Sequence, residues 1–153
     1  MGHRNKQDPL PDLLILIEEK EGPRSLIKEK LQESSLPLAA IQSLREGKDY
    51  LDSDGNSFKV IDYCHPHPPL RSYAFCSDTA FSPELSAYLA GVDLLYHEAT
   101  FMEADQQRAA ETYHCTAKQA AQIAALSGAK KLLLGHFSTR YPDLSDLLAE
   151  AQT

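Results

Sequence analysis

The second half of the chain alternates short apolar runs with helix-like segments, and this order constrains the fold more than any other feature. The apolar runs are Ser72–Cys76, Val92–Tyr96 and Leu132–Leu134. The last two lack alternation with polar residues, which is typical of strands buried on both faces of a sheet. The repeated strand–helix order predicts an α/β fold in which helices cover a mostly parallel sheet.

Helix signals occupy the intervals between and after these runs. Ser82–Glu84 is typical of a helix start, with the serine as N-cap and the proline in the first turn, and this helix should end near residues 90–91. Thr116–Gln119 fits a capping box, which opens an alanine-rich helix that ends at Ser127–Gly128. A closing helix is expected over Leu144–Ala151.

The first half of the chain is less regular. The run Leu13–Glu18 predicts a strand, and the spacing of apolar residues predicts helices over 25–32 and 37–46. Residues Cys64–Leu70 are rich in proline and therefore predict irregular structure.

The composition and net charge limit the cellular compartments and the binding partners that are expected for this chain. The net charge of −7 disfavours nucleic-acid binding through bulk charge, although a bound metal ion can supply local positive charge. The three cysteines are odd in number and widely spaced, which indicates reduced thiols and a cytoplasmic protein. The start of the sequence shows no secretory signal pattern, and the apolar run at 13–17 is too short for a membrane span.

Polar residues follow each of the three strands predicted for the second half. Asp78 follows the first, His97 and Glu98 close the second, and His136 closes the third. Ligands bind outside the carboxyl ends of such strands, so these side chains are expected at one edge of the sheet. His114 precedes the capped helix, where backbone N–H groups favour an anion such as phosphate. The alternative is that Asp78 caps a turn and Glu98 lies on the surface.

Four motifs in this half resemble those of ribonuclease Z, the tRNA 3′-end endonuclease of the metallo-β-lactamase superfamily. They are Cys76–Thr79, His97–Phe101, His114–Thr116 and Gly135–Tyr141, in the family's order and at similar spacing. The resemblance implies the C-terminal half of an αββα sandwich. It also implies a hydrolase that removes the 3′ trailer from precursor tRNA, with Zn²⁺ as cofactor and two ions in the complete enzyme.

The same resemblance implies roles for individual residues. Asp78 would bridge two zinc ions, and His136 would bind one of them; carboxylate and imidazole groups are both suitable zinc donors. Glu98 and His114 would form an acid–base pair near the scissile phosphate. Arg140 would either contact phosphate or remain solvated.

Residues 18–60 resemble, more loosely, the protruding helical arm with which bacterial ribonuclease Z grips tRNA. The segment Glu18–Arg24 contains a Gly-Pro pair, as such arms do. By this resemblance Arg24 and Lys28 would contact backbone phosphates without selecting a base sequence. The alternative is a solvated helix face, because acidic residues are mixed with the basic ones.

The resemblance divides the chain into three parts. Residues 1–17 are expected to be a partly disordered remnant of an N-terminal strand, in which His3 is similar to a metal ligand of the family. The arm follows over 18–60, and residues 61–153 are expected to form the C-terminal half of the metallo-β-lactamase-like domain.

The family's main metal-binding signature, His-x-His-x-Asp-His, is absent from the sequence. The only His-x-His, at His65–His67, is followed by prolines and predicts a structural loop. Too few ligands remain for two metal sites, so the chain alone is expected to hold almost no zinc and to be inactive. A single sheet would also expose an apolar face, which predicts a homodimer or coverage by another chain.

Two other functions stay open at this point. The chain could be a non-catalytic tRNA-binding or dimerisation module derived from the same family. It could also be another phosphodiesterase of the metallo-β-lactamase fold, although the arm-like segment and the His114 motif argue against that reading.

Overall fold

The computed structural model describes residues 13–153, which separate into two compact units. The first unit contains the described residues up to Glu18 together with Arg71–Thr153, and the second is Glu19–Leu70. Residues 61–70 therefore group with the second unit, whereas the sequence placed them with the C-terminal half.

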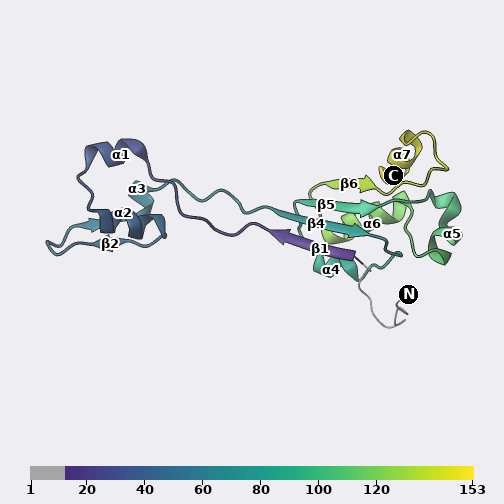
Figure 1. Cartoon of the computed structure of the whole chain (residues 1–153), viewed down its shortest axis with the longest axis horizontal. Helices are drawn as coiled ribbons and strands as arrows, with labels where there is room; N and C mark the ends of the chain where they lie inside the picture. The colour runs from purple at the N-terminus through teal and green to yellow at the C-terminus, as the bar shows by residue number, and fades with distance from the viewer. Residues whose placement is uncertain (1–12) are drawn as a thin grey trace. The chain divides into compact units, whose positions relative to one another are not determined.

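A four-stranded sheet forms the centre of the first unit (Figure 1). Its strands are β1 (Leu13–Glu18), β4 (Ser72–Ser77), β5 (Leu94–Glu98) and β6 (Leu132–Gly135), in the spatial order β1-β4-β5-β6. Strands β4, β5 and β6 run parallel, whereas β1 pairs antiparallel with β4. The prediction of an α/β fold with a mostly parallel sheet is confirmed.

Strand β5 begins at Leu94, later than the expected start at Val92. The difference arises at Asp93, whose carboxylate accepts the Ser72 N–H at 2.7 Å and pairs with the Lys130 ammonium at 2.5 Å. Asp93 thus ties the beginning of β5 to the beginning of β4 with its side chain, and regular strand pairing starts after it.

The helices of the first unit are α4 (Leu85–Tyr88), the 3-10 turn η1 (Glu103–Asp105), α5 (Gln106–Glu111), α6 (Ala117–Ser127) and α7 (Ser145–Ala151). Helices α4, α6 and α7 were expected from the sequence, whereas η1 and α5 were not. The missed elements are short, and their apolar spacing covers less than two turns, so periodicity gives little signal there.

The two predicted helix starts have different outcomes. The helix expected from Ser82 begins later because the Ser82 hydroxyl donates to the Glu84 carboxylate at 2.7 Å and does not cap the helix. The capping box before α6 is confirmed: the Thr116 hydroxyl accepts the Gln119 N–H at 3.1 Å, and the Gln119 side chain accepts the Thr116 N–H at 3.0 Å. Helix α6 ends at Ser127, and the C-cap residue Gly128 has a φ of 66°, which is left-handed and unstrained for glycine.

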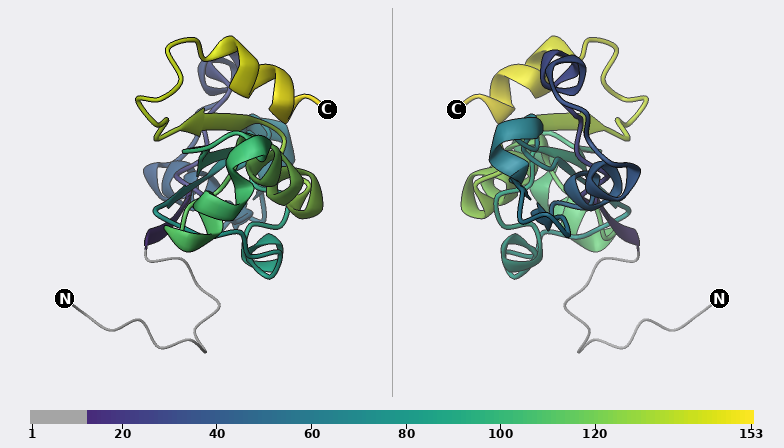
Figure 2. Two further views of the ribbon diagram at one scale, coloured as in Figure 1. Left: turned by 90° about the vertical axis from the view of Figure 1, so that its right-hand side faces the viewer. Right: turned by 90° about the vertical axis from the view of Figure 1, so that its left-hand side faces the viewer.

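Helices α4 and α6 cover one face of the sheet. Ala74, Cys76 and Leu95 on the strands are fully buried against Leu85 of α4 and Ile123 of α6. Helix α7, yellow in Figures 1 and 2, packs against α6 and adds a second apolar cluster. This helical layer holds β4, β5 and β6 in place and so fixes where their carboxyl ends project.

The opposite face of the sheet carries apolar side chains that remain partly exposed. The paired residues Ile15, Phe75, Tyr96 and Leu133 form one row across the four strands. Ile15 is 44% and Leu133 is 51% exposed, and the rings of Phe75 and Tyr96 stack with centroids 4.5 Å apart. The prediction that β5 and β6 are buried on both faces is therefore wrong, whereas the expected uncovered apolar face is present.

The second unit consists of α1 (Lys28–Glu33), α2 (Leu38–Arg45), β2 (Tyr50–Leu51), β3 (Ser57–Phe58) and α3 (Val60–Tyr63). Both predicted helices are present. The first begins at residue 28, later than expected, because Leu26 forms a backbone bridge with Cys64. The β2–β3 hairpin and α3 were not expected. No helix or strand lies in the proline-rich segment 64–70, as predicted, although Cys64 forms the isolated bridge with Leu26.

The lengths of the helices and the environment of the cysteines are relevant to membrane insertion and to thiol chemistry. No helix in the range 13–153 is long and apolar enough to cross a membrane. All three cysteines are free and buried. Burial raises the pKa of Cys76 to about 12, so this thiol stays protonated and unreactive at neutral pH.

His97 is fully buried on β5, paired in register with Cys76 of β4 and Leu134 of β6. Its Nδ1 donates to the Glu98 backbone carbonyl at 2.8 Å, and its Nε2 has no hydrogen-bond partner in the described part of the chain. Burial lowers the pKa of His97 below its ordinary range, because the charged ring would lose its hydration. His97 is therefore neutral in the folded state.

Replacing His97 by leucine should weaken the dependence of the unfolding free energy on pH in the acidic range. The unfolded chain takes up a proton at His97 below about pH 6.5, whereas the folded chain does so only at lower pH. The wild type should therefore lose up to about 1.4 kcal/mol of unfolding free energy per pH unit below that point. The His97→Leu protein should lack this component in urea unfolding between about pH 5 and 8. His65→Leu, at an exposed histidine, is the control, and parallel curves for wild type and His97→Leu would contradict the assignment.

Candidate metal centre

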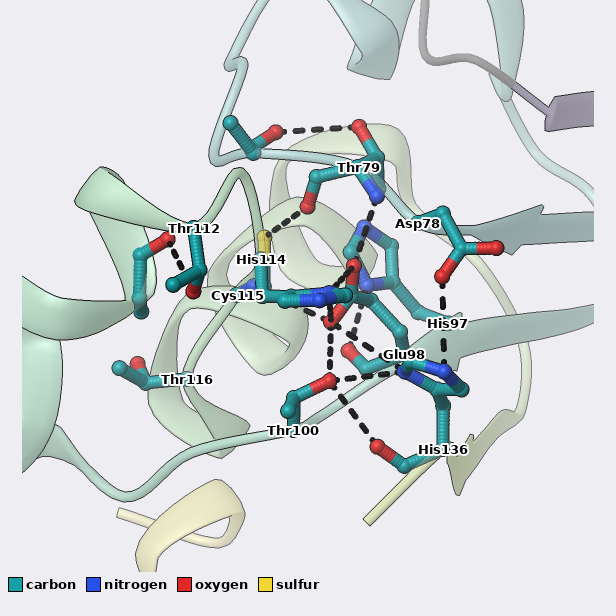
Figure 3. A network of polar contacts seen from close by, with 12 residues as sticks. Asp78, Thr79, His97, Glu98, Thr100, Thr112, His114, Cys115, Thr116 and His136 are labelled. Carbon is teal, nitrogen blue, oxygen red and sulfur yellow. Dashed lines mark hydrogen bonds and ion pairs between the residues drawn. The ribbon is translucent and has the colours of Figure 1, made fainter. Parts of the chain in front are cut away.

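Four polar side chains converge at the carboxyl edge of the sheet (Figure 3). Asp78 follows β4, Glu98 is the last residue of β5, and His136 follows β6. His114 lies in the loop between α5 and α6, which the Phe101–Thr116 bridge brings beside the segment that follows β5. The parallel strands and this one bridge therefore assemble residues that are distant in sequence.

The backbone is strained at this site. Asp78, Tyr113 and His136 have φ values of 50°, 60° and 58°, and they are the non-glycine residues with positive φ in the described part of the chain. Such conformations are uncommon for residues other than glycine and concentrate at functional sites. Two of the three residues are predicted site residues, and the third directly precedes His114.

The predicted adjacency of Asp78 and His136 is present. His136 Nε2 lies 3.4 Å from Asp78 Oδ1, and both side chains are about half exposed, at 43% and 56%. One donor atom from each of Asp78, His114 and His136 lies within 4.8 Å of the other two. The described residues contain no other group of three or more possible ligands of this kind. Their role as metal ligands stays a prediction.

The Glu98 carboxylate lies at the centre of the hydrogen-bond network of the site. Its carboxylate is fully buried and accepts hydrogen bonds from the Thr79 N–H at 2.6 Å and the Cys115 N–H at 3.2 Å. It also accepts from the Thr100 hydroxyl at 2.6 Å and from His114 Nδ1 at 3.0 Å. An ionised carboxylate only accepts hydrogen bonds, so this set of donors satisfies a charge that burial would otherwise make costly. The alternative that Glu98 is a surface residue is wrong.

The contact with Glu98 determines which His114 nitrogen faces the site. Because the carboxylate only accepts, His114 Nδ1 carries the proton that it shares with Glu98. His114 Nε2 is then left for an external partner, and the His114 ring lies 5.2 Å from the His136 ring between centroids. A carboxylate behind an imidazole is a common support for a metal-binding or proton-donating histidine.

Two threonines of this network were not singled out from the sequence. Thr79 gives its backbone N–H to Glu98, and Thr100 gives its hydroxyl to the same carboxylate. Both are buried polar residues, at 1% and 8% exposure. Sequence alone does not tell which threonine is buried. The one feature that could have identified these two is their position inside the four motifs, next to predicted site residues.

Two further candidates from the sequence are His3 and Arg140. His3 falls outside the described residues. Arg140 lies 3.9 Å from the Asp105 carboxylate and over the Phe101 ring, at 5.9 Å from its centroid. Those neighbours favour a structural role over a phosphate contact for this guanidinium.

The two candidates of the arm, Arg24 and Lys28, belong to the second unit. The Arg24 N–H donates to the Arg45 carbonyl at 2.8 Å, and Lys28 is exposed at the start of α1. His67, in the His-x-His of this unit, lies 3.1 Å from the Gly22 carbonyl oxygen through Nε2. That contact agrees with the structural loop predicted for the His-x-His.

A model of the β-lactamase superfamily domain matches residues 40–137 of the chain. The chain belongs to the β-lactamase superfamily. Its relatives include the ribonuclease Z of Porphyromonas gingivalis, 49% identical over 94% of this chain and 47% of the relative. The ribonuclease Z of Bacteroides fragilis is 43% identical over 95% of this chain and 48% of the relative. The chain spans about half the length of the curated relatives that it matches.

A solved structure supports the fold of this β-lactamase superfamily chain. The metallo-β-lactamase fold protein YhfI from Bacillus subtilis is similar with a TM-score of 0.50 and 23% identity, over 54% of this chain and 33% of that chain. The resemblance to ribonuclease Z expected from the four motifs is confirmed by the relatives.

Replacing Glu98 by glutamine should destabilise the fold around the site. Glutamine offers one acceptor oxygen and an NH₂ group, so at least one donor now aimed at the carboxylate would lose its partner. An unsatisfied buried donor costs about 1–3 kcal/mol, which denaturant unfolding would measure. The matched change Glu111→Gln, at an exposed residue of α5, should have almost no effect. Equal stability of the Glu98→Gln protein and the wild type would show that the network is not formed.

Proposed function

We propose that this chain carries part of the zinc site of a ribonuclease Z-type endoribonuclease that removes the 3′ trailer from precursor tRNA. The observation that carries the proposal is the placement of Asp78 and His136 side by side, with the Glu98–His114 pair next to them. A different phosphodiesterase of the same superfamily is the weaker alternative, because relatives that are 40–49% identical and cover more than 90% of this chain are named ribonuclease Z.

The donor set fits zinc. Asp78 and His136 would hold the ion through a carboxylate oxygen and Nε2, which are ordinary zinc donors. Bound there, zinc would supply Lewis-acid stabilisation of the phosphate and a more acidic bound water. Two ions need more ligands than the described residues offer at this edge, so we propose that the remaining ligands come from protein outside this chain or from its first residues, such as His3.

His114 and Glu98 are proposed to handle the proton of the leaving group. Glu98 holds His114 Nδ1 at 3.0 Å and thereby directs Nε2 toward the space beside Asp78 and His136. A proton carried on Nε2 can pass to the 3′-oxygen as the phosphodiester bond breaks. The buried carboxylate fixes the ring for this step and compensates the positive charge of the protonated imidazole.

In the complete enzyme, a second layer of protein is proposed to cover the open face of the four-stranded sheet. The row of Ile15, Phe75, Tyr96 and Leu133 leaves apolar side chains partly exposed on this face, which favours a cover in solution. The other half of an αββα sandwich would provide it, and a homodimer partner would then contact the assembled enzyme elsewhere. A cytoplasmic location stays a prediction that rests on the reduced cysteines.

The isolated chain should not cleave precursor tRNA, because its ligand set is incomplete. The measurement is hydrolysis of a labelled precursor by the purified chain with added zinc, together with zinc content by elemental analysis, which should be near zero without added metal. If hydrolysis appears, a comparison of Asp78→Ala with the exposed control Asp146→Ala would show whether the activity depends on Asp78. Activity that is lost only in Asp78→Ala would overturn the expectation of an inactive chain.

The second candidate function is tRNA binding without chemistry, and the second unit favours it. Glu19–Leu70 is a compact unit with its own buried residues, among them Ala40, Leu44 and Cys64. In that case tRNA should bind without zinc. Arg24→Ala should weaken binding and lower the slope of log affinity against log salt by about one, as for one lost phosphate contact. The control is Arg108→Ala in α5, and equal affinity of Arg24→Ala and the control would exclude the proposed contact.

A further inference from the structure

The Thr100 hydroxyl connects the acid–base pair to the predicted metal ligand. Thr100 is 8% exposed and follows the end of β5. Its Oγ1 lies 2.6 Å from Glu98 Oε2, 2.9 Å from His136 Nδ1 and 2.9 Å from the His136 carbonyl oxygen (Figure 3). The Thr100 carbonyl in turn accepts the Ser138 N–H at 3.1 Å, so the loop after β6 is attached to Thr100 at two points.

The number of protons at these contacts decides how His136 is protonated. The Thr100 hydroxyl has one proton to donate and two lone pairs. Glu98 Oε2 and the His136 carbonyl are acceptors only, and the short contact to the charged carboxylate is the stronger of the two. Whichever of these oxygens takes the proton, the contact between Oγ1 and His136 Nδ1 is a hydrogen bond only if Nδ1 carries a proton of its own.

The opposite arrangement is disfavoured by the same count. If Thr100 donated to His136 Nδ1, no proton would lie between Oγ1 and Glu98 Oε2, which are 2.6 Å apart. Two oxygen atoms with facing lone pairs repel at that distance, and the Glu98 carboxylate would lose one of its donors inside the protein. The Nδ1–H form of His136 is therefore the one that the network stabilises.

We propose that Thr100 is a positioning residue that holds His136 in the Nδ1–H tautomer and so points a bare Nε2 lone pair at Asp78. Nε2 and Asp78 Oδ1, 3.4 Å apart, are then both acceptors, and a cation between them would satisfy both. Glu98 holds His114 in the same tautomer through Nδ1. One buried carboxylate, directly and through Thr100, thus presents two Nε2 atoms to one space.

This inference rests on the proposed function only where it takes His136 to be a metal ligand; the tautomer itself is a property of the metal-free chain. The two ideas can therefore fail separately. A hydroxyl that only filled space would leave the ring free to adopt either tautomer, and its removal would not change which nitrogen is protonated.

The test is a long-range ¹H–¹⁵N correlation spectrum of the ¹⁵N-labelled full chain without metal, at about pH 8, where an ordinary histidine is neutral. The spectrum shows which ring nitrogen carries the proton in each histidine, and the signals that vanish in His136→Gln assign His136. In the wild type, His136 and His114 should both be Nδ1–H. In Thr100→Val, which replaces the hydroxyl by a methyl group, His136 should shift toward the Nε2–H form while His114 stays Nδ1–H. Thr100→Ser should behave as the wild type.

Zinc added to the same samples supplies the second readout. The ring signals of His136 should respond to zinc in the wild type and in Thr100→Ser, and Thr100→Val should need about 10–100-fold more zinc for the same response. The amide spectrum of each variant reports whether it is folded. An Nε2–H form of His136 in the wild type would overturn the proposal even if Thr100→Val does not fold.

Each outcome separates the ideas. An Nε2–H wild-type His136, or an unchanged tautomer in folded Thr100→Val, would overturn the role of Thr100. An Nδ1–H wild type that shifts in Thr100→Val but shows no response to zinc would support the role of Thr100 and count against the proposed metal site.

Discussion

The charge of the buried Glu98 carboxylate can be accommodated only if the surrounding segments supply its hydrogen bonds. They come from the turn after β4, from the residue that follows β5 by two positions, and from the loop before α6. Burial of an unpaired carboxylate costs several kcal/mol, so these segments are held together by the need to satisfy one charge. The site is therefore a consequence of that constraint, as much as of the sheet that carries it.

The strained backbone at Asp78 and His136 follows from the same arrangement. Each residue leaves a parallel strand and turns at once, so that its side chain lies beside the end of β5. A left-handed conformation costs such a residue about 1–3 kcal/mol, which the surrounding structure must offset. Burial of the α4–α6 side of the sheet and the hydrogen bonds around Glu98 are the interactions available to do so.

Much of this arrangement was predictable from sequence because it depends on local rules. The four strands of the first unit, the Thr116 capping box and the placement of Asp78 and His136 at one sheet edge follow from periodicity, cap chemistry and the geometry of parallel strands. The late start of α4 was not, since the Ser82 hydroxyl had two possible partners. The apolar runs of β5 and β6 did not by themselves predict the exposed side of these strands, because an apolar run does not state what covers it; that side was expected only from the missing part of the family's fold. The role of Thr100 depends on contacts between residues far apart in the chain.

Gly135, the last residue of β6, limits which sequences can build this edge. A Cβ atom there would lie 2.3 Å from the Tyr96 hydroxyl oxygen and 2.5 Å from the Tyr96 ring carbon Cε2. The ring has little freedom to retreat, because it stacks on Phe75. With the Tyr96 ring in this position, any side chain at position 135 would clash with it. Among relatives of this chain, a larger residue at 135 should be accompanied by a smaller one at 96, which offers a pairwise marker for this geometry.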